Sequence, residues 1–128
     1  MRSIRTLSII LALGLLCACA GANGTPVDLR PGETAVTIEA DSFHFKPSQI
    51  RAVQGTRLQI LLKNVAGIAH NLTIQNPDGE TLVNQDVAAG ATERLTVDLE
   101  QAGTYKLLCD KPLHPSLGMK GEILVARR

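Results

Sequence analysis

The sequence predicts an all-β fold, a Greek-key β-sandwich or barrel of seven to eight short strands. From Thr34 onward, apolar and polar residues alternate with a period of two in short runs, which is typical of strands with one buried face. Turn-forming residues separate these runs, and no stretch shows the period of a long helix. At 128 residues and 13.7 kDa, the chain has room for one ordinary domain.

The predicted strands follow one another closely along the chain. Phe43 and Phe45 place both rings on one face of a short strand, and Pro47 indicates an edge or a bend after them. Residues 84–89 are compatible with a single helical turn. The other alternating runs are 36–39, 58–63, 70–75, 94–99 and 123–125, and turns are predicted at 54–56, 76–79, 89–90 and 102–103.

The N-terminus has the pattern of an export signal. Arg2 and Arg5 precede a mainly apolar run over residues 7–16, which is too short to span a membrane but suits a signal-peptide core. Residues 16–19 read Leu-Cys-Ala-Cys and resemble a bacterial lipobox. We therefore predict a lipoprotein signal peptide over residues 1–18 and lipidation of Cys19. The alternative is ordinary cleavage after residues 18–20 (Ala-Cys-Ala), which gives a soluble periplasmic protein.

The predicted mature protein is a tethered domain of nearly neutral charge. Residues 19–33 are small, polar and interrupted by prolines, and we interpret them as a tether between the lipid anchor and a domain over residues 34–128. This arrangement places the domain at the periplasmic face of the bacterial envelope. Without Arg2 and Arg5, the chain has eleven basic and twelve acidic residues. That balance and the scarcity of aromatic residues exclude a nucleic-acid binder.

The most informative stretch lies between the last two predicted strands. After the signal, Cys109 is the only cysteine left in the domain, with His114 five residues later and Met119 five residues after that. His70 begins a separate run and shares its core-facing side with Leu72 and Ile74. An imidazole from a strand can therefore meet a thiolate, an imidazole and a thioether from one loop.

Two histidines, one cysteine and a weakly bound methionine are the ligands of a blue-copper site. Thiolate and thioether suit Cu(I), whereas imidazole also accepts Cu(II), so a fixed arrangement serves both oxidation states. Zinc fits less well, because structural zinc sites rarely use a thioether. Taken singly, each of these side chains also has an ordinary role in a core or on a surface. Their combination at this spacing predicts one type 1 copper.

Residues 43–125 resemble the cupredoxins, the family of plastocyanin and azurin. The matching residues are Phe43-x-Phe45-x-Pro47, Gly55, Asn64, His70-Asn71 and Tyr105-x3-Cys109-x4-His114-x4-Met119-x-Gly121. The resemblance implies that His70, Cys109, His114 and Met119 are the copper ligands, and that Asn71 ties the two ligand segments together. Two positions depart from the family pattern. Leu107 replaces a frequent aromatic residue, and Leu113 replaces a glycine, which places the loop geometry at residue 113 in question.

We interpret the protein as a monomeric carrier of single electrons between redox partners, such as a cytochrome or a copper or haem oxidoreductase, and not as an enzyme. The first alternative is copper storage, delivery or resistance without electron transfer. The second is an enzyme with Cys109 and His114 as a nucleophile–base pair, for which the sequence supplies no further catalytic group. The third is an interaction domain that has lost its copper.

The loop around His114 also predicts a docking surface. Pro112, Leu113 and Pro115 are unusually apolar for an exposed turn, and they surround the ligand that we expect nearest to solvent. Lys111 and Lys120 lie at the margins of this loop and favour an acidic partner face.

Overall fold

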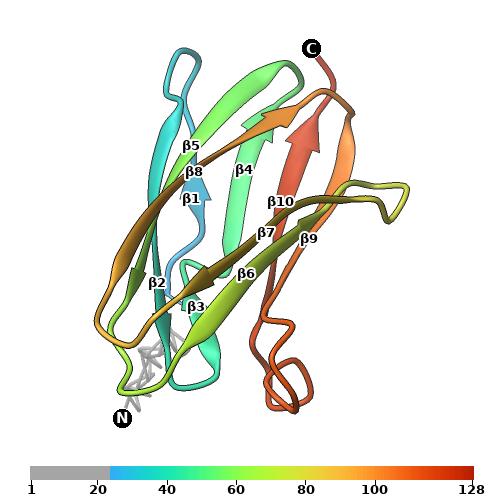
Figure 1. Ribbon diagram of the computed structural model, residues 1–128. Coiled ribbons are helices and arrows are strands. Elements are labelled where there is room, and N and C mark those ends of the chain that lie inside the picture. Colours follow the sequence, from blue (N-terminus) through green and yellow to red (C-terminus); the bar gives the residue numbers. More distant parts are fainter. Residues whose placement is uncertain (1–23) are drawn as a thin grey trace, which may run out of the picture.

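The computed structural model describes residues 24–128, which fold into ten strands in two sheets, with no helix in that range (Figure 1). The predicted signal peptide and Cys19 lie outside the described residues. The strands are β1 (Val27–Asp28), β2 (Ala35–Asp41), β3 (His44–Lys46), β4 (Gln49–Val53), β5 (Thr56–Asn64), β6 (His70–Gln75), β7 (Thr81–Val87), β8 (Thr92–Leu99), β9 (Gly103–Leu108) and β10 (Lys120–Ala126).

The strands form a sandwich of two mixed sheets. One sheet has six strands in the order β1-β4-β10-β9-β6-β7, and the other has four in the order β3-β2-β5-β8. Strands far apart in sequence are neighbours in both sheets, for example β2 beside β5 and β4 beside β10. The predicted all-β sandwich is therefore confirmed.

The core lies between the two sheets and follows the period-two pattern. In β5, Leu58, Ile60 and Leu62 are buried while Arg57 and Gln59 are exposed. The same alternation buries Val97 and Leu99 in β8, and Ile123 and Val125 in β10. β6 differs, because His70 through Ile74 are all buried and both of its faces are covered.

Three features differ from the prediction. The fold reaches back beyond the predicted boundary at residue 34, since Val27 and Asp28 pair with β4 and Leu29 packs against the core. The strand number rises to ten because β1, β4 and β7 lie outside the predicted runs, and β1 has only two residues, too short to leave a periodic signal. The helical turn predicted for residues 84–89 is wrong, because the backbone from Thr81 to Val87 pairs with β6.

The sheet topology brings three ligand-bearing positions to one end of the sandwich (Figure 1). β6 and β9 are antiparallel, with Thr73 opposite Leu108, so the start of β6 lies beside the end of β9. β10 begins with Lys120 opposite Leu108, which places Met119 near Cys109. No helix in residues 24–128 is long and apolar enough to cross a membrane.

Candidate metal centre

Backbone pairing positions His70 and Cys109. His70 is the first residue of β6, and it pairs with Val87 of β7. Cys109 directly follows β9, and its N–H donates to the carbonyl of Met119 at 3.2 Å. Both side chains are fully buried, as the strand pattern predicts.

A chain of tight turns positions His114 within the loop that joins β9 to β10. The His114 N–H donates to the Lys111 carbonyl at 3.1 Å, and the His114 carbonyl accepts from the N–H groups of Leu117 and Met119 at 3.2 and 3.1 Å. The His114 side chain is half-buried at the surface of the domain, whereas Met119 is fully buried. The loop thus holds one ligand residue near solvent and the other in the core.

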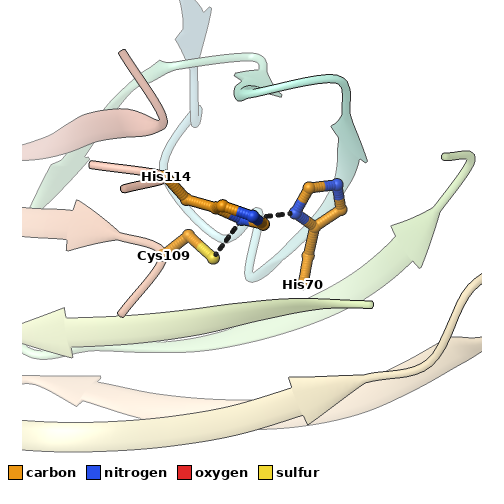
Figure 2. Close-up of side chains that lie close together, drawn as sticks. All are labelled: His70, Cys109 and His114. Atoms are coloured by element: carbon orange, nitrogen blue, oxygen red, sulfur yellow. Dashed lines mark hydrogen bonds between the residues drawn. The ribbon is translucent and has the colours of Figure 1, made fainter. Parts of the chain in front are cut away.

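Three of the predicted ligands converge on one point, as Figure 2 shows. The Nδ1 atoms of His70 and His114 are 3.2 Å apart, and Cys109 Sγ is 3.4 Å from His114 Nδ1. A ligand atom from each residue lies within 4.8 Å of the others, and no other group of His, Cys, Asp or Glu in residues 24–128 has this arrangement. The buried Met119 joins the same end of the core.

The chemistry of these side chains fits a soft metal ion. Burial lowers the pKa of His70, and the nearby His114 lowers it further against the opposing effect of Asp41, which favours the neutral imidazole that a metal ion requires. His70 Nε2 is buried without a hydrogen-bond partner. A metal ion on Nδ1 would fix the ring proton on Nε2. Cys109 has no disulfide partner among the described residues, which leaves its sulfur available.

Comparison with known proteins identifies the family. Residues 32–126 match the family described as copper binding proteins, plastocyanin/azurin family. The chain belongs to this family. It is 34% identical to the plastocyanin of Daucus carota over 87 residues, which is 63% of this chain and 86% of that protein. Plastocyanin A/B of Petroselinum crispum gives the same identity over the same share of both chains.

Solved cupredoxin structures share the fold. The dithionite-reduced auracyanin of Roseiflexus castenholzii superposes with a TM-score of 0.67 at 21% identity, covering 73% of this chain and 97% of that one. Auracyanin A, a "blue" copper protein of Chloroflexus aurantiacus, gives 0.63 at 18% identity, with 80% and 100% covered. The predicted cupredoxin fold is confirmed. Copper is the cofactor of this family, and His70, Cys109, His114 and Met119 are positioned like a type 1 copper site.

Leu113, which replaces the family's glycine before His114, fits into the loop in a strained conformation. Leu113 adopts a φ of 68°, the left-handed conformation that favours glycine, and its side chain is 73% exposed. The departure from the family pattern therefore costs backbone strain but leaves the site assembled. Leu107, the other departure, is buried in the core.

Asn71 occupies the position expected of a residue that links the ligand segments. It is fully buried, and its Oδ1 accepts from the Asp110 N–H at 3.4 Å and from the Thr73 hydroxyl at 2.7 Å. Asn71, the residue after His70, is thus hydrogen-bonded to Asp110, the residue after Cys109.

Two contacts beside the ligands were not predicted from the sequence. The Phe43 ring packs edge-on against the His114 ring, with centroids 5.1 Å apart, and Phe43 has a φ of 60°. Phe43 lies in the turn before β3 and not in the strand that the sequence predicted for it. The only sign of Phe43 in the sequence was the Phe43-x-Phe45-x-Pro47 pattern.

The second contact joins β7 to the ligand loop. Asp86 and Lys111 form an ion pair at 2.7 Å. The hydrogen bond from Lys111 is the main cause that lowers the pKa of Asp86, and the same bond raises the pKa of Lys111.

Proposed function

We propose that this protein is an exported, monomeric carrier of single electrons, held at the periplasmic face of the envelope by a lipid on Cys19, and that it is not an enzyme. The observation that carries this proposal is the converging set of two imidazoles and one thiolate beside a buried methionine. Membership of a blue-copper family gives electron transfer as the general role. Export of this chain, its lipid anchor and its redox partner are the parts that we propose beyond that general role.

In electron transfer, the protein's role is to keep the ligand atoms in one arrangement for both oxidation states of the metal. Copper bound there would supply a one-electron couple between Cu(I) and Cu(II). Cys109 and His70 are buried and held by paired strands, so these side chains need little movement when the charge changes. His114 is half-buried and reaches the surface, which makes its ring edge the shortest route for an electron to a partner.

Exposed apolar side chains gather at the same end of the domain. In residues 24–128 the exposed large hydrophobic side chains are Val65, Ile68, Leu82, Leu113 and Leu117, and all except Leu82 lie in the two loops that flank the ligands. Pro112 is exposed beside Leu113, and Pro115 is half-buried. We assign these loops as the docking surface for a redox protein such as a cytochrome or a copper or haem oxidoreductase. A small apolar contact suits a short-lived complex.

The rim of this surface is less basic than the sequence predicts. Lys111 is paired with Asp86, so its charge is largely offset. Lys120 belongs to no ion pair among the described residues. We therefore expect apolar contact, rather than attraction to an acidic face, to dominate partner binding.

A visible spectrum of the copper-loaded mature protein tests the metal site. We expect an intense thiolate-to-Cu(II) charge-transfer band that disappears in Cys109→Ala, because the thiolate is its origin. Met119→Leu should keep copper but raise the reduction potential, because a weak donor that stabilises Cu(II) is lost. If Cys109→Ala keeps both the band and the metal, the assignment is wrong. A protein that binds copper but shows no reversible couple would favour storage or delivery.

Electron exchange with a cytochrome tests the docking surface. Leu113→Asp places a charge at the centre of the apolar surface, and we expect a slower exchange rate with an unchanged copper spectrum. Leu82→Asp makes the same change at another exposed leucine, on β7 outside the two loops, and is the matched control. An unchanged rate in Leu113→Asp would show that electrons do not pass through this surface.

Fractionation and mass spectrometry test the anchor. The wild-type protein should be recovered with membranes and should begin at a lipidated Cys19, since two or more acyl chains give stable attachment. Cys19→Ser should appear in the soluble fraction or remain an unprocessed precursor. A mature wild-type protein that begins at Gly21 without lipid would establish the soluble alternative.

A further inference from the structure

Strand β7 is bonded to the ligand loop through two side chains, and neither of them forms a hydrogen bond or ion pair with a predicted ligand. Asn84 Nδ2 donates to Asp110 Oδ2 at 2.9 Å, and Asp86 accepts from Lys111 Nζ at 2.7 Å. Asp110 and Lys111 are the first two residues after Cys109. β7 therefore holds the beginning of the ligand loop from outside the centre.

The same two side chains also hold Asn71. Asn71 Nδ2 donates to Asn84 Oδ1 at 2.7 Å and to Asp86 Oδ1 at 3.2 Å. With the two bonds accepted by its Oδ1, all the hydrogen-bonding capacity of the Asn71 amide is used. If the amide turned over, its NH2 group would face the Asp110 N–H, and its oxygen would face the Asp86 carboxylate. The two acceptors on β7 therefore fix the orientation in which the Asn71 oxygen meets the loop.

Asn84 is the residue that joins both halves of this network. Its oxygen accepts from Asn71, which follows His70, and its NH2 group donates to Asp110, which follows Cys109. One amide thus bridges the residues next to two predicted ligands that come from different strands. Outer groups of this kind orient metal ligands and influence the affinity for the metal.

We propose that Asn84 is a positioning residue for the copper centre: by bridging Asn71 and Asp110 it sets the position of the Cys109 thiolate relative to the His70 imidazole. Asp86 supports it by holding Asn71 and Lys111. This role rests on the proposed copper function, because it concerns the geometry offered to that metal. It concerns residues of this chain that lie outside the ligand set and outside the docking surface.

The donor and acceptor of the bridge can be exchanged to test it. Asn84→Asp places a carboxylate against the Asp110 carboxylate and removes the donor, so the bridge breaks. Combining it with Asp110→Asn returns a donor on the loop side and an acceptor on the strand side, and restores the original net charge. Leu82→Ala is the control, because residue 82 is an exposed residue of the same strand and has no polar atom in its side chain.

The readouts are Cu(I) affinity by competition with a chelator, the position of the charge-transfer band, and urea unfolding of the metal-free protein. We expect Asn84→Asp to lower affinity about tenfold or more and to shift the band, with a much smaller change in metal-free stability. The exchanged pair should recover both properties, and Leu82→Ala should match the wild type.

Two results would overturn the proposal in different ways. If the wild type shows the band and Asn84→Asp matches it in affinity and spectrum, or loses only metal-free stability, Asn84 has no positioning role. If the wild type itself shows no charge-transfer band, the proposed copper function fails, and the positioning role fails with it.

Discussion

His70 and His114 each present their Nδ1 atom to the centre, but they do so from two differently built regions. His70 begins β6, is fully buried, and pairs with Val87 of β7, while β9 holds the other edge of the same strand. His114 lies among successive turns, is half-buried, and has Phe43 packed against its ring. The Nδ1 atoms nevertheless meet at 3.2 Å. One side of the centre is therefore fixed by the sheet, while the other is fixed by a loop that faces solvent.

This difference indicates a division of roles around the metal. The strand side excludes water and preserves the geometry, because moving His70 would disrupt the sandwich core. On the proposed function, the loop side provides the contact with a partner. This loop also contains the strained Leu113, whose side chain is exposed. Strain that persists at an exposed position often marks a functional residue.

The largest effect is expected from removing each imidazole in turn. Both His70→Gly and His114→Gly should lose the normal charge-transfer band. Added imidazole should restore a band in His114→Gly, because the vacated space opens to solvent, and should fail in His70→Gly, because that space is enclosed by the core. Absorption titrations with imidazole measure the difference. Equal rescue of both variants would contradict the division.

A smaller but still large effect is expected from Gly121→Ala on the strand side. A Cβ at residue 121 would overlap the Ser48 carbonyl oxygen, which accepts from the Glu122 N–H at 2.8 Å. Forcing β10 away from this segment should lower the free energy of unfolding by about 1–3 kcal/mol. Urea denaturation of the metal-free protein measures the loss. Gly67→Ala is the control, since a Cβ there has nothing within 4 Å.

A pH dependence of the metal-free protein should follow from the burial of His70. Its pKa is lowered in the folded state, so below about pH 6.5 the unfolded chain binds more protons than the folded one. The free energy of unfolding should therefore fall as the pH drops through this region, with a slope of at most about 1.4 kcal/mol per pH unit for one proton. Urea denaturation at pH 7.5, 6 and 5 measures it. A slope unchanged in His70→Gln would show that another group is responsible.

The smallest effect has the opposite sign and lies in the loop. Leu113→Gly relieves a φ of 68°, which more than offsets the extra freedom that glycine gives the unfolded chain. We expect a gain of about 0.5–1 kcal/mol in the free energy of unfolding. Leu117→Gly, which removes an exposed leucine without a positive φ from the same loop, should lower stability instead. A loss of stability in Leu113→Gly would mean that the Leu113 side chain packs in solution.

The sequence alone determined the sandwich and the identity of the central residues. Alternation at Leu58, Ile60 and Leu62 marks one buried face, because a strand turns successive side chains to opposite sides. The spacing of Cys109, His114 and Met119 is equally local, since all three belong to one loop and its flanks. The strain at Leu113 could also be foreseen, because the conformation needed there is a property of a single residue.

Only the tertiary structure decided what surrounds the ligands. Asn84 meets Asp110 across 26 positions of sequence, and Phe43 meets His114 between separate loops. Residues 84–89 read locally as a turn of helix, yet pairing with β6 makes most of that segment a strand and directs Asn84 and Asp86 toward the ligand loop. β1 is likewise a strand only because β4 pairs with it. Such contacts depend on strand register and sheet order, which are set by the packing of the whole core and leave no periodic signal in any short stretch of sequence.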